Sequence, residues 1–130
     1  GPRSGSSTTS LDMISAIPTD LLLDSIATRL DPAVIGNAAL ALNFNFSDRN
    51  EKARVTVENA VMISEMGEAH AKPSVTLTGP RQFFLGLFFL KLPLAQLEAA
   101  GLKIEGDRTA IEALQAAIET PPNVFNIVTP

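Results

Sequence analysis

The feature that most constrains this sequence of 130 residues is an apolar segment that follows Pro80. Its apolar members are Phe83, Phe84, Leu85, Leu87, Phe88, Phe89 and Leu90. In a helix, where each residue turns by about 100°, these side chains point in every direction. A sheet can cover one face, so the other faces need a further apolar partner. The segment is also far shorter than the roughly 20 residues of a membrane-spanning helix, so no span is predicted.

The residues before this segment predict strands. Apolar and smaller or polar residues alternate from residue 40 onward, which is typical of a strand with one buried face. The apolar positions of that strand are Leu40, Leu42, Phe44 and Phe46. Further strands are predicted around residues 55–57, 61–63, 74–77 and 102–104, and the first three strands should form an antiparallel meander.

Asn59 and Ala60 fall at the two turn positions between the second and third predicted strands. A two-residue hairpin turn of this kind usually requires positive φ angles, which Asn and Gly adopt readily. Ala60 is therefore an unfavourable residue at its position.

Helical periodicity and capping signals predict the remaining elements. Thr19 is a candidate N-cap for a helix over residues 19–30. Asp31, followed by Pro32, predicts a second, short helix. A helix over residues 92–97 and a last helix capped by Asp107 complete an α+β domain.

The composition excludes several functions. With 10 Lys and Arg against 14 Asp and Glu, the net charge is −4, which argues against a nucleic-acid partner. The absence of Cys excludes thiol redox chemistry and Cys-ligated metals. All seven aromatic residues are Phe, so the Trp and Tyr rings used for base stacking and membrane interfaces are missing. We expect a soluble protein, cytoplasmic or periplasmic.

Few residues could carry catalysis. His70 is the only histidine, and even with Glu65 and Glu68 it would form an incomplete metal site, so we expect a surface histidine. Asp20 and Asp24 have the spacing of paired acids, but their position near a helix N-terminus explains them without chemistry. We predict no catalytic residue, no metal ligand and no cofactor.

Arg81 and Lys91 flank the apolar segment. A pocket between that helix and the sheet would be apolar with few polar groups, which suits an aliphatic chain. Arg81 and Lys91 are then candidates for contact with an anionic head group at its mouth. The alternative is that both are ordinary solvated residues at helix ends.

Four segments carry a resemblance to a known family: PTDLLLDSIATRL, VTVENAVMIS, LKIEGDRTAIEAL and the terminal FNIVTP. They resemble the C-terminal domain of bacterial linear alkylsulfatases, a sterol-carrier-protein-like domain, over about residues 17–130. The resemblance implies a five-stranded, mostly antiparallel sheet covered by helices, with a hydrophobic tunnel between them. In that family, hydrolysis belongs to a separate metallo-β-lactamase-like domain with two zinc ions, whose HxHxDH motif one histidine cannot supply.

A tunnel in this position would be lined by inward-facing residues of the sheet and of the apolar helix. The predicted lining residues are Phe44, Val57, Met62, Phe84, Leu87, Phe88, Leu92, Leu97 and Phe125. Leu92, Leu97 and the tail residue Phe125 are expected to close its ends.

Residues 1–16 are predicted to be a cloning scar and flexible linker, and residues 17–130 a lipid-binding domain. The expected function is non-catalytic binding of a long aliphatic molecule, such as a fatty acid, an alkyl sulfate or another lipid. The domain would serve an alkylsulfatase or be a stand-alone relative. The alternative is a docking module whose Phe/Leu-rich helix packs on a neighbouring domain or second subunit and binds no ligand.

Overall fold

The computed structural model describes residues 16–120 of the chain, so Phe125 and residues 1–15 of the predicted linker lie outside them. The elements follow in the order α2 (Thr19–Ala27), α3 (Pro32–Ile35), β1 (Leu40–Phe46), β2 (Glu51–Glu58), β3 (Val61–Met66), β4 (Val75–Gly79), α4 (Arg81–Phe88), α5 (Leu94–Ala100), β5 (Lys103–Gly106) and α6 (Arg108–Ala117). The predicted α+β class and the predicted set of strands are confirmed.

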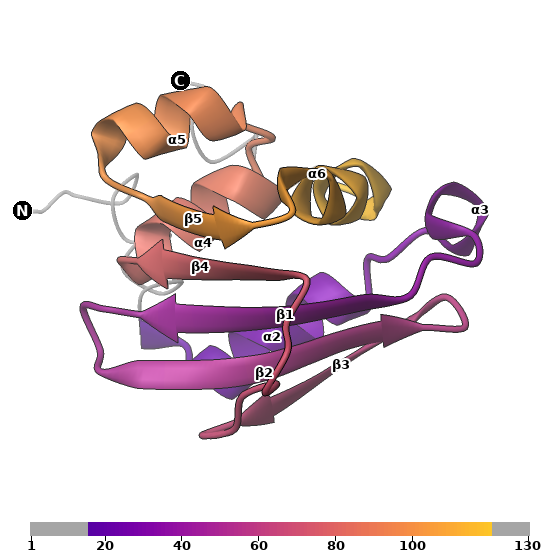
Figure 1. Ribbon diagram of the computed structural model, residues 1–130, viewed down its shortest axis with the longest axis horizontal. Helices are drawn as coiled ribbons and strands as arrows, with labels where there is room; N and C mark the ends of the chain where they lie inside the picture. The colour runs from indigo at the N-terminus through magenta and orange to yellow at the C-terminus, as the bar shows by residue number, and fades with distance from the viewer. Residues whose placement is uncertain (1–15, 121–130) are drawn as a thin grey trace, which may run out of the picture.

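The five strands form one sheet in the order β3-β2-β1-β4-β5 (Figure 1). Neighbouring strands are antiparallel except β1 and β4, which run parallel in the middle of the sheet. The prediction of a five-stranded, mostly antiparallel sheet is therefore confirmed. Because β1 and β4 are parallel, the chain has to cross the sheet between β3 and β4.

This connection crosses the sheet face opposite to α2, in front of β2 and β1 in Figure 1. Asn43 of β1 binds it twice, donating from Nδ2 to the His70 carbonyl at 3.0 Å and accepting from the His70 N–H at 2.7 Å. The Nε2 atom of His70 also lies 3.1 Å from Thr56 Oγ1 and 3.0 Å from the Val55 carbonyl. His70 is thus half-buried and bound to the sheet, rather than the solvated surface histidine that we expected.

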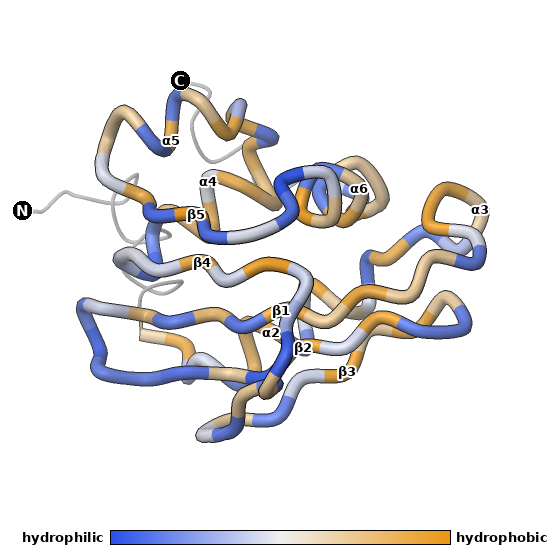
Figure 2. The backbone as a smooth tube through the Cα atoms, viewed as in Figure 1, coloured by the Kyte–Doolittle hydropathy of each residue, from blue (hydrophilic) through white to orange (hydrophobic). Residues whose placement is uncertain are grey.

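The core lies between one face of the sheet and the helices. Along β1 the apolar side chains alternate with Asn43 and Asn45, which Figure 2 shows as alternating colours. Leu42, Phe44 and Phe46 are fully buried, and their register partners on β2 and β4 point to the same face. A strand has a period of two, so one face becomes apolar and the other polar.

The apolar helix α4 is enclosed almost entirely by its own domain. Phe84, Leu87 and Phe88 are at most 1% exposed, and they face the sheet. The opposite side contains Gly86, where an added Cβ would lie 3.0 Å from Leu92 Cδ1, so the segment after α4 packs directly on its backbone. The surplus apolar surface expected from the sequence is therefore buried within the chain.

Two helix starts differ from the sequence prediction. The helix expected from Leu92 begins at Leu94, because Pro93 restricts the preceding residue to extended backbone. Thr19 is the first residue of α2 rather than its cap, and Pro18 occupies the cap position. The caps predicted at Asp31 and Asp107 are confirmed, since each carboxylate accepts a backbone N–H two residues later at 2.9 Å.

The β2–β3 hairpin contains the strained turn that the sequence indicated. Asn59 and Ala60 have φ angles of 54° and 61°, in the left-handed region. This conformation costs a residue with a Cβ about 1–2 kcal/mol, whereas Gly adopts it freely.

Replacing Ala60→Gly should raise the free energy of unfolding by about 0.5–1 kcal/mol, because it removes strain that exceeds the added entropy of an unfolded glycine. The urea midpoint of unfolding measures the change. Ala113→Gly, the same replacement at an exposed position of α6, is the control and should lower stability by about 1 kcal/mol. If Ala60→Gly also lowers stability, the left-handed backbone at Ala60 does not strain the folded protein.

Candidate ligand-binding site

The predicted lining residues that the structure describes belong to one apolar core. Only part of this core, the apolar layer around Phe44, Phe84 and Phe88, lies between α4 and the sheet, whereas Leu92 and Leu97 pack at Gly86 on the other side of α4. Seven of the predicted lining residues are buried members of that core: Phe44, Val57, Met62, Phe84, Leu87, Phe88 and Leu97. Leu92 is partly buried and packs against that core, whereas Phe125 lies outside the described residues. The layer is closed around its own side chains.

Aromatic rings form the centre of this layer. The ring of Phe44 lies 5.0 Å from that of Phe84 and 6.0 Å from that of Phe88, between centroids. Phe46 extends the cluster toward the end of β1, with its centroid 4.6 Å from that of Phe84. All these pairs are tilted, an arrangement that aromatic rings favour over parallel stacking.

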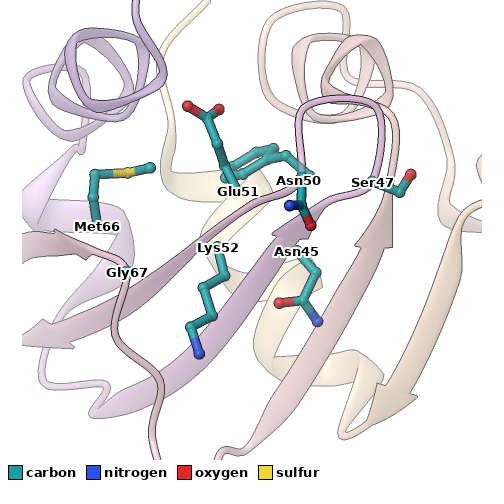
Figure 3. A pocket seen from close by; sticks show the side chains of 8 residues that line it. Asn45, Ser47, Asn50, Glu51, Lys52, Met66 and Gly67 are labelled. Carbon is teal, nitrogen blue, oxygen red and sulfur yellow. The ribbon is translucent and has the colours of Figure 1, made fainter.

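A hollow of about 870 Å³ lies at the end of the sheet where β1 turns into β2 (Figure 3). It is open to solvent, and its volume falls within the range of small-molecule pockets. The residues that line it are Asn45, Phe46, Ser47, Asn50, Glu51, Lys52, Met66 and Gly67. Since Phe46 is fully buried, the hollow ends at this ring, on the border of the apolar layer.

A second hollow, of about 210 Å³, lies at the opposite end of β1 and β2 and includes Val57. Its volume is below the roughly 300 Å³ at which small-molecule pockets begin. The larger hollow is therefore the better candidate for the entrance of a ligand.

The sequence analysis did not assign Phe46 and Met66 to the site. The signal was present, because Phe46 has the same alternation as Phe44, and Met66 lies on the same face of β3 as Met62. What the alternation could not show is that the sheet leaves a hollow at this end.

Arg81, a predicted head-group residue, is buried beside the larger hollow. Its guanidinium donates to the Ile17 carbonyl and, at 3.1 Å, to Thr19 Oγ1, and the Thr19 hydroxyl in turn donates to the Glu51 carboxylate. Burial lowers the pKa of the Arg81 guanidinium below its usual value. A head group could reach Arg81 only in exchange for these bonds.

Lys91, the other predicted head-group residue, lies at the far end of α4. Its ammonium donates to the backbone carbonyl of Gln115 on α6, and burial lowers its pKa. The Gln115 side chain donates from Nε2 to the carbonyls of Leu87, at 2.9 Å, and Leu92, at 2.7 Å. The Leu87 carbonyl is one that the end of α4 leaves without an intrahelical partner, and Leu92 belongs to the segment that follows α4. The two bonds of Gln115 thus attach α4 and this segment to α6.

Replacing Gln115→Ala should therefore lower the free energy of unfolding by about 1–3 kcal/mol, because it leaves two partly buried carbonyls without their donor. Chemical unfolding in urea measures the loss. The control, Gln96→Ala, makes the same change at an exposed position of α5 and should stay within about 0.5 kcal/mol of the parent chain. Equal stability of the two variants would show that the bonds of Gln115 contribute nothing.

Within residues 16–120, no group of three or more His, Asp or Glu side chains lies close enough together to hold a metal ion. No helix in the same residues is long and apolar enough to cross a membrane.

The class of this domain follows from solved structures with the same arrangement. The UbiJ-SCP2 ubiquinone synthesis protein matches with a TM-score of 0.61 at 14% identity, over 84% of this chain and 94% of that one. The apo form of sterol carrier protein 2 from Yarrowia lipolytica matches with a TM-score of 0.51 at 19% identity, over 78% and 94%. The fold is that of the sterol carrier proteins, as predicted.

The chain belongs to the alkyl sulfatase C-terminal family, whose model matches residues 7–130. The sec-alkylsulfatase Pisa1 from Pseudomonas sp. has a TM-score of 0.76 at 22% identity, over 82% of this chain and 17% of that one. A linear primary-alkylsulfatase from Pseudomonas sp. is 30% identical over 124 residues, which are 95% of this chain and 18% of the relative. An (R)-specific secondary-alkylsulfatase from Pseudomonas sp. is 28% identical over 121 residues, or 92% and 18%.

The chain therefore spans 18% of the length of these alkylsulfatases. It corresponds to their C-terminal domain and not to their catalytic domain.

Proposed function

We propose that this domain binds the hydrocarbon chain of a long aliphatic molecule, such as a fatty acid or an alkyl sulfate, in the apolar layer between α4 and the sheet. The observation that supports this most directly is the unbroken contact of rings from the hollow into the layer. Phe46 lines the hollow and contacts Phe84, which contacts Phe44, and Phe44 contacts Phe88. An alkyl chain that passes Phe46 would meet apolar groups along its whole length.

Binding requires the layer to open, because its side chains fill it. Apolar contacts have no preferred direction. An alkyl chain that separates Phe44 from Phe84 would replace ring–ring contacts by ring–methylene contacts and leave no polar group unpaired. The sequence-predicted lining residues remain the proposed lining, and Phe46 and Met66 join them at the entrance.

The expected affinity follows from the area that becomes buried. Twelve methylenes at about 0.8 kcal/mol each give on the order of 10 kcal/mol. Ordering the ligand and opening the layer oppose this gain by several kcal/mol, so we expect micromolar dissociation constants.

In a larger protein, the domain would gather or shield the alkyl chain of the substrate for a separate catalytic domain. The names of the relatives, a linear primary-alkylsulfatase and a secondary-alkylsulfatase, support a ligand of this kind. The catalytic partner that we expect is a metallo-β-lactamase-like hydrolase domain of the same protein. The lipid-binding role does not depend on that partner and would also suit a stand-alone relative.

The alternative function, docking through the Phe/Leu-rich helix, has less support from the structure. Of the large apolar residues of this segment only Leu90 is well exposed, at 42%. A partner would therefore find little of the helix to contact unless α4 left the domain.

The chain-length dependence of binding tests the proposed function. We expect the affinity for octanoate, decanoate and dodecanoate to rise by up to about fourfold per added methylene, which corresponds to about 0.8 kcal/mol. Calorimetric titration of the purified chain measures the affinity, and a negative heat-capacity change would report apolar burial. Equal affinities for the three acids, or no binding by a folded domain, would favour the docking alternative.

A pair of variants on β3 tests the entrance. Met66→Asp places a carboxylate in the hollow and should weaken decanoate and 1-decanol binding at least tenfold, because a charge next to hydrocarbon must be desolvated. Ile63→Asp makes the same type of change on the opposite face of this strand, at a side chain that is 56% exposed, and should leave binding unchanged. If Met66→Asp binds 1-decanol as tightly as the parent chain, the ligand does not enter here.

The purified chain should release no sulfate from dodecyl sulfate, with or without added zinc, because one histidine cannot supply the ligand motif of the hydrolase domain. Sulfate release that increases with protein concentration and stops when a chelator is added would contradict this expectation.

A further inference from the structure

We propose that Asn45, Asn50 and Lys52 form a binding site for an anionic head group at the mouth of the larger hollow. The inference rests on the proposed function and adds a preference to it. The domain would bind sulfate esters and carboxylates more tightly than uncharged alcohols of the same chain length.

The three side chains come together through the hairpin between β1 and β2. Asn45 and Lys52 are directly opposed partners in the register, so their Cβ atoms lie about 5 Å apart. Asn50 belongs to the turn, where its φ of 53° is left-handed, and it lines the same hollow. Figure 2 shows this turn as a continuous hydrophilic segment.

Their side chains also lie on one side of the strands. Figure 3 shows Lys52 and Asn45 extending to the same side, whereas Glu51 and Met66 extend to the other. This arrangement agrees with the alternation of residues along a strand. The donors and the apolar border of the layer therefore lie on opposite faces of these strands, and a ligand that contacts both would pass around the end of the strands at the hairpin turn.

The Lys52 ammonium and the two Asn amides have N–H groups that are available to a ligand. Among residues 16–120, neither the Lys52 ammonium nor the Asn50 carboxamide has a side-chain hydrogen bond. The Asn45 amide donates one N–H to Thr78 Oγ1 at 3.2 Å, which leaves its second N–H available. Amide and ammonium groups that donate to one anion match the oxygens of a sulfate or carboxylate.

Three carboxylates nearby in sequence and register have other partners than Lys52, although Glu51 also lines the hollow from the opposite side of the strands. Glu51 accepts from the Thr19 hydroxyl, which is itself bound by Arg81. Glu65 pairs with Arg54 at 2.8 Å, and Asp48 accepts the backbone N–H of Arg81 at 2.9 Å. The positive charge of Lys52 is thus left to face the hollow.

A preference of this kind would matter for an alkylsulfatase. Hydrolysis of an alkyl sulfate by water yields an alcohol and inorganic sulfate, so the alkyl chain loses its anionic group in the reaction. A domain with this site would retain the substrate and release the alcohol product more readily, even though both carry the same hydrocarbon chain.

The test compares head groups at a fixed length of ten carbons. The purified chain should bind decyl sulfate and decanoate about three- to tenfold more tightly than 1-decanol, and Lys52→Gln should remove this advantage without changing the affinity for 1-decanol. The advantage of the anions should also shrink as ionic strength rises in the parent chain, but not in Lys52→Gln.

Two further lysine variants serve as comparisons. Lys103→Gln changes an exposed lysine on β5 and should leave all three affinities as they are. Lys91→Gln tests the far end of α4, and a loss of anion preference in this variant alone would place the head group there and overturn the proposal. Equal binding of decanoate and 1-decanol by the parent chain would also overturn it, yet would leave chain binding intact. If no ten-carbon ligand binds, this site and the proposed function are both wrong.

Discussion

The packing of Phe44 against α4 is the interaction on which the rest of this structure depends. Phe44 lies on the central strand β1, and its ring contacts Phe46, Phe84 and Phe88. These contacts place α4 across the sheet and thereby determine where α5, β5 and α6 can follow. They also form an apolar route by which a ligand in the larger hollow could reach the interior along the aromatic cluster. The stability of the domain and its proposed function therefore use the same side chains.

The two ends of α4 are held in a different way from its middle. At the first residue, the Arg81 N–H donates to Asp48 of the β1–β2 turn, and at the other end Gln115 of α6 binds the carbonyls of Leu87 and Leu92. Polar side chains from distant parts of the sequence thus fix both ends, while the contacts of Phe84 and Phe88 with the sheet are apolar. Directional bonds resist displacement more than apolar contacts do, so an entering alkyl chain would part the layer most easily between these ends.

Local patterns were sufficient to predict the secondary structure from the sequence. The period of two in β1, the caps at Asp31 and Asp107 and the strained turn at Ala60 are all properties of neighbouring residues. The family resemblance supplied the sheet and the class of fold, which periodicity alone left open. The burial of Arg81 could not be predicted, because it depends on Thr19 and Glu51, which are distant in sequence. The hollow also escaped prediction, since it depends on how the strand ends and the turn meet in space.

The parallel pairing of β1 and β4 has a consequence for the way the chain folds. The strands β1, β2 and β3 are joined by short turns, so they can pair while contacts are still local. In contrast, β4 can join β1 only after the connection that contains His70 has crossed the sheet, and the pairing of β5 with β4 follows from that step. Long-range pairing carries a larger loop-closure cost and is slower. During synthesis from the N-terminus, α2 is available to cover the β3 side of the meander, whereas the apolar face around Phe44 would stay exposed until α4 emerges.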